Sequence, residues 1–197
     1  MCIFCVPHYT PNQATFTVDS LICTITAPYF ISVAIDSSFS GTTLHVPERL
    51  TFNGDSYVVN DLSLDGLCGN QTVTRVDLPV TVKGPRLNSS LNCPNLTELH
   101  IGNENVYTES MAAPIRAIHS RFFEGCAITD VYMYGYTVPD IGNSSTADQY
   151  DSSHKFTIQN LHADEAMYQR WSRNYEVTHN KYIGAFLYEN LILIESE

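Results

Sequence analysis

Two histidines and one aspartate are the residues of this chain whose types and placement are best suited to chemistry. Each lies between two aliphatic residues, in Leu44-His45-Val46, Val76-Asp77-Leu78 and Leu99-His100-Ile101. If these segments are neighbouring strands, the three polar side chains point to one face of a sheet and lie close together. Imidazole and carboxylate groups so arranged could bind a metal ion or transfer a proton. The other interpretation is a ladder of charged side chains across the strands, worth only a few tenths of a kcal/mol per pair.

Three tyrosines alternate along a further segment of the chain. On one strand they would form an aromatic patch, and aromatic residues are enriched at the centres of recognition surfaces. Their other interpretation is a cover for the C-terminal part of the chain. We therefore take as the candidate binding surface His45, Asp77, His100, Tyr132, Tyr134 and Tyr136. No catalytic residue, metal ligand or cofactor is assigned, because the chain has no nucleophile elbow, phosphate loop, dinucleotide fingerprint, zinc-protease motif or calcium loop.

The elements that position these side chains share a recurring phrase. It is a cysteine, an apolar residue, a threonine and then an alternating apolar and polar run, as in Cys93-Pro94-Asn95-Leu96-Thr97-Glu98-Leu99-His100-Ile101. Two more copies begin at Cys68 and Cys126. Units that recur every 20 to 50 residues are typical of a solenoid, in which each unit buries its apolar face against its neighbours.

Weaker copies without the cysteine extend the pattern in both directions. The register that we predict aligns Leu44, Val76, Leu99, Val131, Phe156 and Leu191. It places His45, Asp77, His100, Tyr132 and Thr157 in one outward row, flanked by Arg75, Glu98, Asp130 and Lys155. The predicted repeat core is Val76, Leu78, Cys93, Leu96, Leu99, Ile101, Cys126, Ile128 and Val131. Cys68, Cys93 and Cys126 are expected to stack as buried thiols, rather than to form disulfides or ligate a metal.

The segments on either side of the repeats predict two caps. Ala14 to Ile35 alternates in short runs, which indicates two or three antiparallel strands covering the exposed end of the solenoid. Asn53-Gly54 predicts a tight hairpin. Ala163 to Arg173 is the predicted helix, with two acids in its first turn and an apolar face.

Composition excludes several classes of protein. With 10 Lys and Arg against 21 Asp and Glu, the net charge of −11 disfavours nucleic acid and anionic lipid as partners. No apolar run is long enough for a transmembrane segment.

Cys2, Cys5 and His8 have a zinc-like spacing, but a single Cys-x-x-Cys is a weak signal, so a frayed terminus is preferred.

The chain resembles the BspA-like leucine-rich repeat family of bacterial and protist cell-surface proteins. Ile118 to Thr129 fits its phrase of isoleucine, spacer, aromatic, Gly-Cys and an apolar-Thr pair. Gly54 to Val59 is similar to the tyrosine-bearing hairpin ahead of the first repeat, and Tyr134 to Ile141 to the exit from the last. The resemblance implies a parallel sheet, an N-terminal β cap, a short C-terminal helix near Tyr168 and Trp171, secretion or display at the cell surface, and adhesion.

We therefore predict a mostly β repeat solenoid. Residues 1–13 are expected to be disordered or leader-like, and residues 14–195 to form one leucine-rich repeat domain: cap 14–43, repeats 44–136 and C-terminal cap 137–195. The first residues lack the basic start of a secretory signal, so export is implied by the resemblance alone. The predicted function is a non-enzymatic binding module that recognises a protein or a glycan through the exposed sheet face. The alternatives are a structural spacer and, third, a metal or hydrolytic site at His45, Asp77 and His100.

Overall fold

The computed structural model describes residues 14–82, 90–102, 123–134, 156–165, 167–169, 172–173, 182–183 and 186–194. The predictions made for residues 1–13, for Lys155, for Tyr136 and for Trp171 lie outside this set. Among the described residues, no helix is long and apolar enough to cross a membrane.

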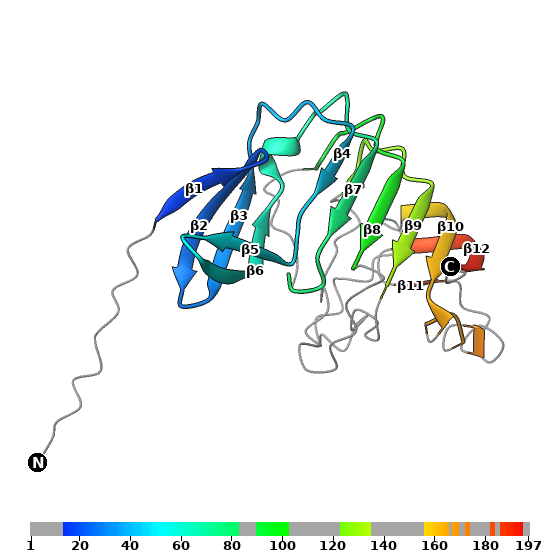
Figure 1. Cartoon of the computed structure of the whole chain (residues 1–197). Helices are drawn as coiled ribbons and strands as arrows, with labels where there is room; N and C mark the ends of the chain where they lie inside the picture. The colour runs from blue at the N-terminus through cyan, green and yellow to red at the C-terminus, as the bar shows by residue number, and fades with distance from the viewer. Residues whose placement is uncertain are drawn as a thin grey trace, which may run out of the picture.

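The larger sheet is the stacked face of the solenoid (Figure 1). Its strand order is β11-β12-β10-β9-β8-β7-β4, and every neighbouring pair from β4 to β12 is parallel. Only β11 pairs antiparallel, with β12. The strands are β4 (Thr43–His45), β7 (Arg75–Leu78), β8 (Glu98–Ile101), β9 (Asp130–Met133), β10 (Phe156–Ala163), β11 (Tyr182–Ile183) and β12 (Phe186–Leu193).

The smaller sheet covers the N-terminal end of the larger one. Its strand order is β1-β2-β3-β6-β5. The strands are β1 (Thr15–Val18), β2 (Leu21–Ala27), β3 (Phe30–Ile35), β5 (Arg49–Phe52) and β6 (Asp55–Ser63). The first three pair antiparallel, as the alternation predicted, but β3 pairs parallel with β6. Asn53 and Gly54 both have positive φ, as the tight turn between β5 and β6 requires.

The register of the first four parallel strands is the one expected from the repeats. Leu44 pairs with Val76, Val76 with Leu99, and Leu99 with Val131. The expected fifth position, Phe156, is wrong: Val131 pairs with Leu161, which in turn pairs with Leu191. β10 is eight residues long and carries two apolar triplets, Phe156-Thr157-Ile158 and Leu161-His162-Ala163. Only the second of these triplets lies beside β9.

One hydrophobic core runs from the smaller sheet through the stacked strands. In the repeats, the inner row of Leu44, Val76, Leu99, Val131 and Leu161 is at most 1% exposed. The other predicted core residues are also buried, except that Cys126 is partly exposed. At about 25 cal/mol per Å² of apolar surface, this continuous core is the main stabilising contribution.

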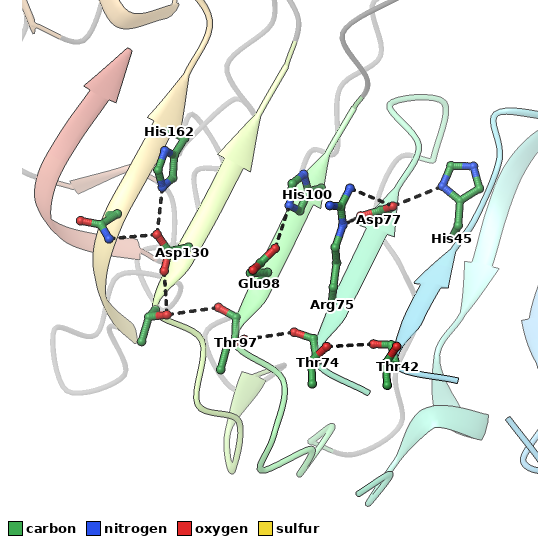
Figure 2. Close-up of polar contacts among 12 residues, drawn as sticks. Thr42, His45, Thr74, Arg75, Asp77, Thr97, Glu98, His100, Asp130 and His162 are labelled. Carbon is green, nitrogen blue, oxygen red and sulfur yellow. Dashed lines mark hydrogen bonds and ion pairs between the residues drawn. The ribbon is translucent and has the colours of Figure 1, made fainter. Parts of the chain in front are cut away.

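The threonine of each phrase forms a ladder between successive coils. The Thr74 hydroxyl donates to the carbonyl oxygen of Thr42 at 3.2 Å. In the same way, the Thr97 hydroxyl donates to Thr74 O at 3.3 Å, and the Thr129 hydroxyl donates to Thr97 O at 3.5 Å. The backbone N–H of each threonine donates to the same carbonyl. The threonines are separated by 32, 23 and 32 residues, so coils of unequal length meet at one fixed position (Figure 2).

A second line of equivalent residues lies at the turns that precede β7, β8 and β9. Gly69, Asn92 and Gly125 all have positive φ, and Gly69 N donates to Leu91 O as Asn92 N donates to Glu124 O. The residues that follow them, Asn70, Cys93 and Cys126, are therefore the equivalent ones. The expectation that Cys68 shares the buried position was wrong. Cys68 is exposed, and the Asn70 amide occupies that position, where it donates to Phe39 O and accepts from Val73 N.

The helix begins later than predicted. Ala163 ends β10, and helical residues are found at 165, 167–169 and 172–173. Asp164 caps the helix by accepting the Met167 N–H at 2.9 Å, while its carbonyl accepts the Tyr168 N–H. Met167 is buried against the core. The predicted fold class, a mostly β repeat solenoid with a parallel sheet, an N-terminal cap and one short helix, is confirmed.

We expect Gly66→Ala to destabilise the protein by about 1 to 3 kcal/mol, the usual range for overpacking a core. Gly66 lies in the 3-10 turn η1 (Asp65–Leu67), and a Cβ there would collide with the carbonyl oxygen of Ile35 at the end of β3. The free energy of unfolding from urea denaturation measures the effect. The control is Gly69→Ala, where a Cβ meets nothing within 4 Å and only its φ of 74° opposes a side chain. An equal or smaller loss for Gly66→Ala would contradict this packing of the cap.

Candidate binding surface

The outward face of the parallel sheet carries two rows of side chains. The pairings place in the outward row His45, Asp77, His100, Tyr132, His162 and Ile192. Two residues earlier on each strand, they place in the flanking row Thr43, Arg75, Glu98, Asp130, Asn160 and Asn190. Alternation along each strand points these rows away from the core.

Three rings of the outward row form one aromatic stack. The His100 and Tyr132 ring centroids are 4.1 Å apart with planes 9° from parallel, and those of Tyr132 and His162 are 4.0 Å apart and 5° from parallel. Tyr134, just past the end of β9, has its ring centroid 6.2 Å from that of His100. Strands lie about 4.8 Å apart, so planar side chains at equivalent positions come into face-to-face contact. We call His100, Tyr132 and His162 the ring stack.

Each histidine of the outward row contacts a carboxylate (Figure 2). His162 Nε2 lies 2.9 Å from Asp130 Oδ1, and His100 Nε2 lies 3.4 Å from Glu98 Oε2. At the other end of the row, His45 Nδ1 lies 3.3 Å from Asp77 Oδ2. Imidazole and carboxylate therefore pair along the whole row.

Asp77 is held from both sides. The Arg75 guanidinium donates from Nε to Asp77 Oδ1 at 2.6 Å and from Nη2 to Oδ2 at 3.3 Å. Such bidentate pairing fixes the plane of the carboxylate. Asp77 is 16% exposed at its side chain, whereas His45 is 64% and Arg75 40% exposed. The β4 and β7 end of the surface thus presents a guanidinium and an imidazole to solvent.

The opposite end of the surface is held together by amide side chains around Asp130. Asn160 Nδ2 donates to Asp130 Oδ1 at 2.9 Å, and Asn190 Nδ2 donates to Asn160 Oδ1 at 3.1 Å. Asp130 Oδ2 accepts the Thr129 hydroxyl at 2.7 Å. Burial of Asp130 favours its neutral form, but the hydrogen bonds from His162, Thr129 and Asn160 outweigh burial and lower its pKa.

The centre of the surface is largely covered by its own rings. The His100 side chain is only 9% exposed. Burial is the main cause that lowers the pKa of His100 below its usual value of 6.5; Arg75 lowers it further, and Asp77 and Glu98 oppose the shift. Burial also raises the pKa of Tyr132, with smaller contributions from Asp130 and Glu98. His100 and Tyr132 are therefore uncharged at neutral pH.

The structure brings together most of the residues chosen from the sequence. His45 and His100 lie on either side of Asp77, in adjacent strands, and Tyr132 follows His100. Among the described residues, no group of three or more His, Cys, Asp or Glu side chains is placed to hold a metal ion.

One expected member of the outward row was wrong, and one member was missed. Thr157 is not in the outward row, where His162 takes its place. In the flanking row, Asn160 lies beside Asp130. The error has one cause, the choice of the first apolar triplet of β10. The signal that would have found His162 was present, since Leu161-His162-Ala163 repeats the pattern of Leu99-His100-Ile101.

Comparisons with known proteins add a structural likeness. No protein-family model matches the chain, and no curated protein matches it. The chain is similar to a solved leucine-rich repeat protein from Bacteroides capillosus, with 19% sequence identity and a TM-score of 0.41. The match covers 62% of this chain and 100% of that one. The fold of this chain is therefore assigned from its own strand pairing and not from this likeness.

We expect His100 to make the protein less stable in mild acid. A histidine whose pKa is lower in the folded than in the unfolded state contributes stability above pH 6.5, which is lost as the pH falls through the lower, folded value. His100→Asn should therefore reduce the fall in the free energy of unfolding between about pH 7 and pH 5. The matched control is His45→Asn, because the His45 side chain is mostly exposed. If His100→Asn kept the wild-type pH profile and His45→Asn lost it, the loss of stability in acid would not be due to His100.

Asp130 does not interfere with this measurement. Its pKa is lowered in the folded protein, so its contribution to stability is lost only as the pH falls below 3.8.

Proposed function

We propose that this protein is a non-enzymatic binding module that recognises its ligand through the outward face of the parallel sheet. The observation that carries the proposal is the continuous ring stack, with its paired carboxylates, across β8, β9 and β10. These side chains are held by hydrogen bonds and ring contacts before any ligand arrives. Preorganised side chains lower the entropic cost of binding.

The geometry of the rings favours polar recognition over stacking. Because the rings are nearly parallel and about 4 Å apart, their faces cover one another and their edges point outward. A ligand therefore meets the Tyr132 hydroxyl and the neighbouring carboxylates. Both faces of Tyr132 and the inner faces of His100 and His162, on which a sugar could stack, are covered inside the stack. This supports a protein ligand over a glycan.

Charge supports a ligand with cationic side chains. Among the described residues of the two rows, the carboxylates of Asp77, Glu98 and Asp130 face one guanidinium, that of Arg75, which is already paired with Asp77. Glu98 is 43% exposed, the most open of these carboxylates. The whole chain carries a net charge of −11. Complementary charge steers encounter and suppresses wrong partners.

We infer further that the module belongs to the BspA-like group of leucine-rich repeat proteins and acts at the cell surface or after secretion, in adhesion. The support is the repeat phrase, whose threonines form the ladder between coils and whose apolar residues form the core. A structural spacer without a ligand is the alternative that the same experiment tests.

The test is to pan a displayed random-peptide library on the immobilised protein and to probe a glycan array in parallel. We expect enriched peptides to contain Lys or Arg and to bind about tenfold more weakly to Glu98→Gln, a loss of about 1.4 kcal/mol. Tyr132→Ala should weaken them at least as much, and binding should fall with added salt.

The matched control is Tyr29→Ala, which removes an exposed aromatic residue from the turn between β2 and β3 of the smaller sheet. Peptides that bind all three variants equally would show that the outward face is not the site. Binding confined to the glycan array would replace the peptide ligand with a glycan. If neither library binds, the spacer function is favoured.

A further inference from the structure

Two cysteines occupy equivalent places in consecutive coils of the solenoid. Cys93 follows Asn92 and Cys126 follows Gly125, the two residues with positive φ at the turns before β8 and β9. The turns stack directly, since Asn92 N donates to Glu124 O at 3.1 Å. The Cys93 N–H also donates to Cys126 Sγ at 3.4 Å. The Cys126 thiol therefore lies against the residue that carries the Cys93 thiol.

We propose that Cys93 and Cys126 form a redox-responsive pair that closes into a disulfide bond on reaction with a small-molecule disulfide such as oxidised glutathione. The two cysteines lie in turns that lead into β8 and β9, strands whose equivalent residues lie about 4.8 Å apart, and the contact from Cys93 N to Cys126 Sγ shows that the turns approach as closely. Disulfides span Cα separations of about 4.4 to 6.8 Å. Side-chain rotation, without movement of the coils, can therefore bring the two sulfur atoms together.

The reaction balances with one molecule of oxidised glutathione. Cys126, which is partly exposed, attacks one glutathione sulfur, releases one glutathione and becomes a mixed disulfide. Cys93 then attacks Cys126 Sγ and releases the second glutathione. The two thiol protons pass to the two glutathione thiolates, and two protein thiols are oxidised as one glutathione disulfide is reduced.

The burial of the two thiols sets the order of the steps. In the reduced protein, hydrogen bonding between the two thiols is the main cause that lowers the pKa of Cys93 and raises that of Cys126, and this contact ends when Cys126 loses its thiol proton. Cys93 is buried and cannot meet glutathione directly, whereas Cys126 is partly exposed. A buried resolving thiol beside a partly exposed one gives this order of events.

Closing the bond leaves the neighbouring backbone satisfied. In the reduced protein the Cys93 thiol donates to Leu67 O at 3.1 Å. That carbonyl also accepts the Asn70 N–H at 3.0 Å, so it keeps a partner when the thiol proton is lost. The bond would join residues 33 apart in the sequence, and cross-links of such loops stabilise by restricting the unfolded chain.

The other cysteines of the described chain are not equivalent to this pair. Cys23 is buried in β2 of the smaller sheet, where burial raises its pKa to about 11. Cys68 is exposed and lies two residues before the equivalent position, which Asn70 occupies. Its exposure makes it a competing site for glutathione, so the experiment removes it.

The test uses the full chain with Cys2, Cys5 and Cys68 changed to serine, incubated with oxidised glutathione while folded. We expect the intact mass to fall by two hydrogen atoms, a peptide map to join Cys93 with Cys126, and the urea midpoint of unfolding to rise until a reductant is added. A further Cys93→Ser change should instead leave a stable glutathione adduct on Cys126.

Three results would overturn the proposal. These are an unchanged mass, a lasting glutathione adduct when both cysteines are present, and a disulfide that appears only after unfolding in urea. Because a disulfide alters neither the ring stack nor its carboxylates, peptide binding to the outward face tests the proposed function separately.

Discussion

The structure depends on one constraint, the fixed spacing of about 4.8 Å between parallel strands. It requires equivalent residues of successive coils to lie directly above one another. Each side chain must therefore pack against the side chain at the same position of the next coil. Aliphatic residues meet this requirement inside, in the row from Leu44 to Leu161. Threonine meets it at the start of each strand, because its hydroxyl reaches the carbonyl of the coil before. Coils of different length are then held to one register.

The same spacing explains the outward face. Planar side chains at equivalent positions have to stack, as His100, Tyr132 and His162 do. Once stacked, the rings shield one another from water, and burial makes the charged form of His100 unfavourable. The carboxylates of Glu98 and Asp130, in the flanking row, contact the Nε2 atoms of His100 and His162. A preorganised polar surface therefore arises from the repeat itself.

In the turns, the close approach of successive coils restricts which residues fit. Where coils approach closely, a side chain has no room: a Cβ at Gly102 would collide with the carbonyl of Tyr134. The turns before β7, β8 and β9 each contain a residue with positive φ, which is Asn92 before β8 and glycine, Gly69 and Gly125, before the other two. The next position is polar in one coil, at Asn70, and a thiol in the other two. This gives one face of the stack its cysteine pair.

The sequence by itself determined the solenoid, the register of Leu44, Val76, Leu99 and Val131, and the outward placement of His45, Asp77, His100 and Tyr132. Alternation and a repeated phrase are local signals, and each of these strands has only one possible alignment. Tertiary structure decided the alignment of β10, which carries two similar triplets, and so brought His162 rather than Thr157 to the ring stack. It also excluded Cys68 from the cysteine position, because the turn aligns on its residue of positive φ and not on the cysteine. The parallel pairing of β3 with β6 was likewise settled by contacts between segments distant in the sequence, which no local pattern encodes.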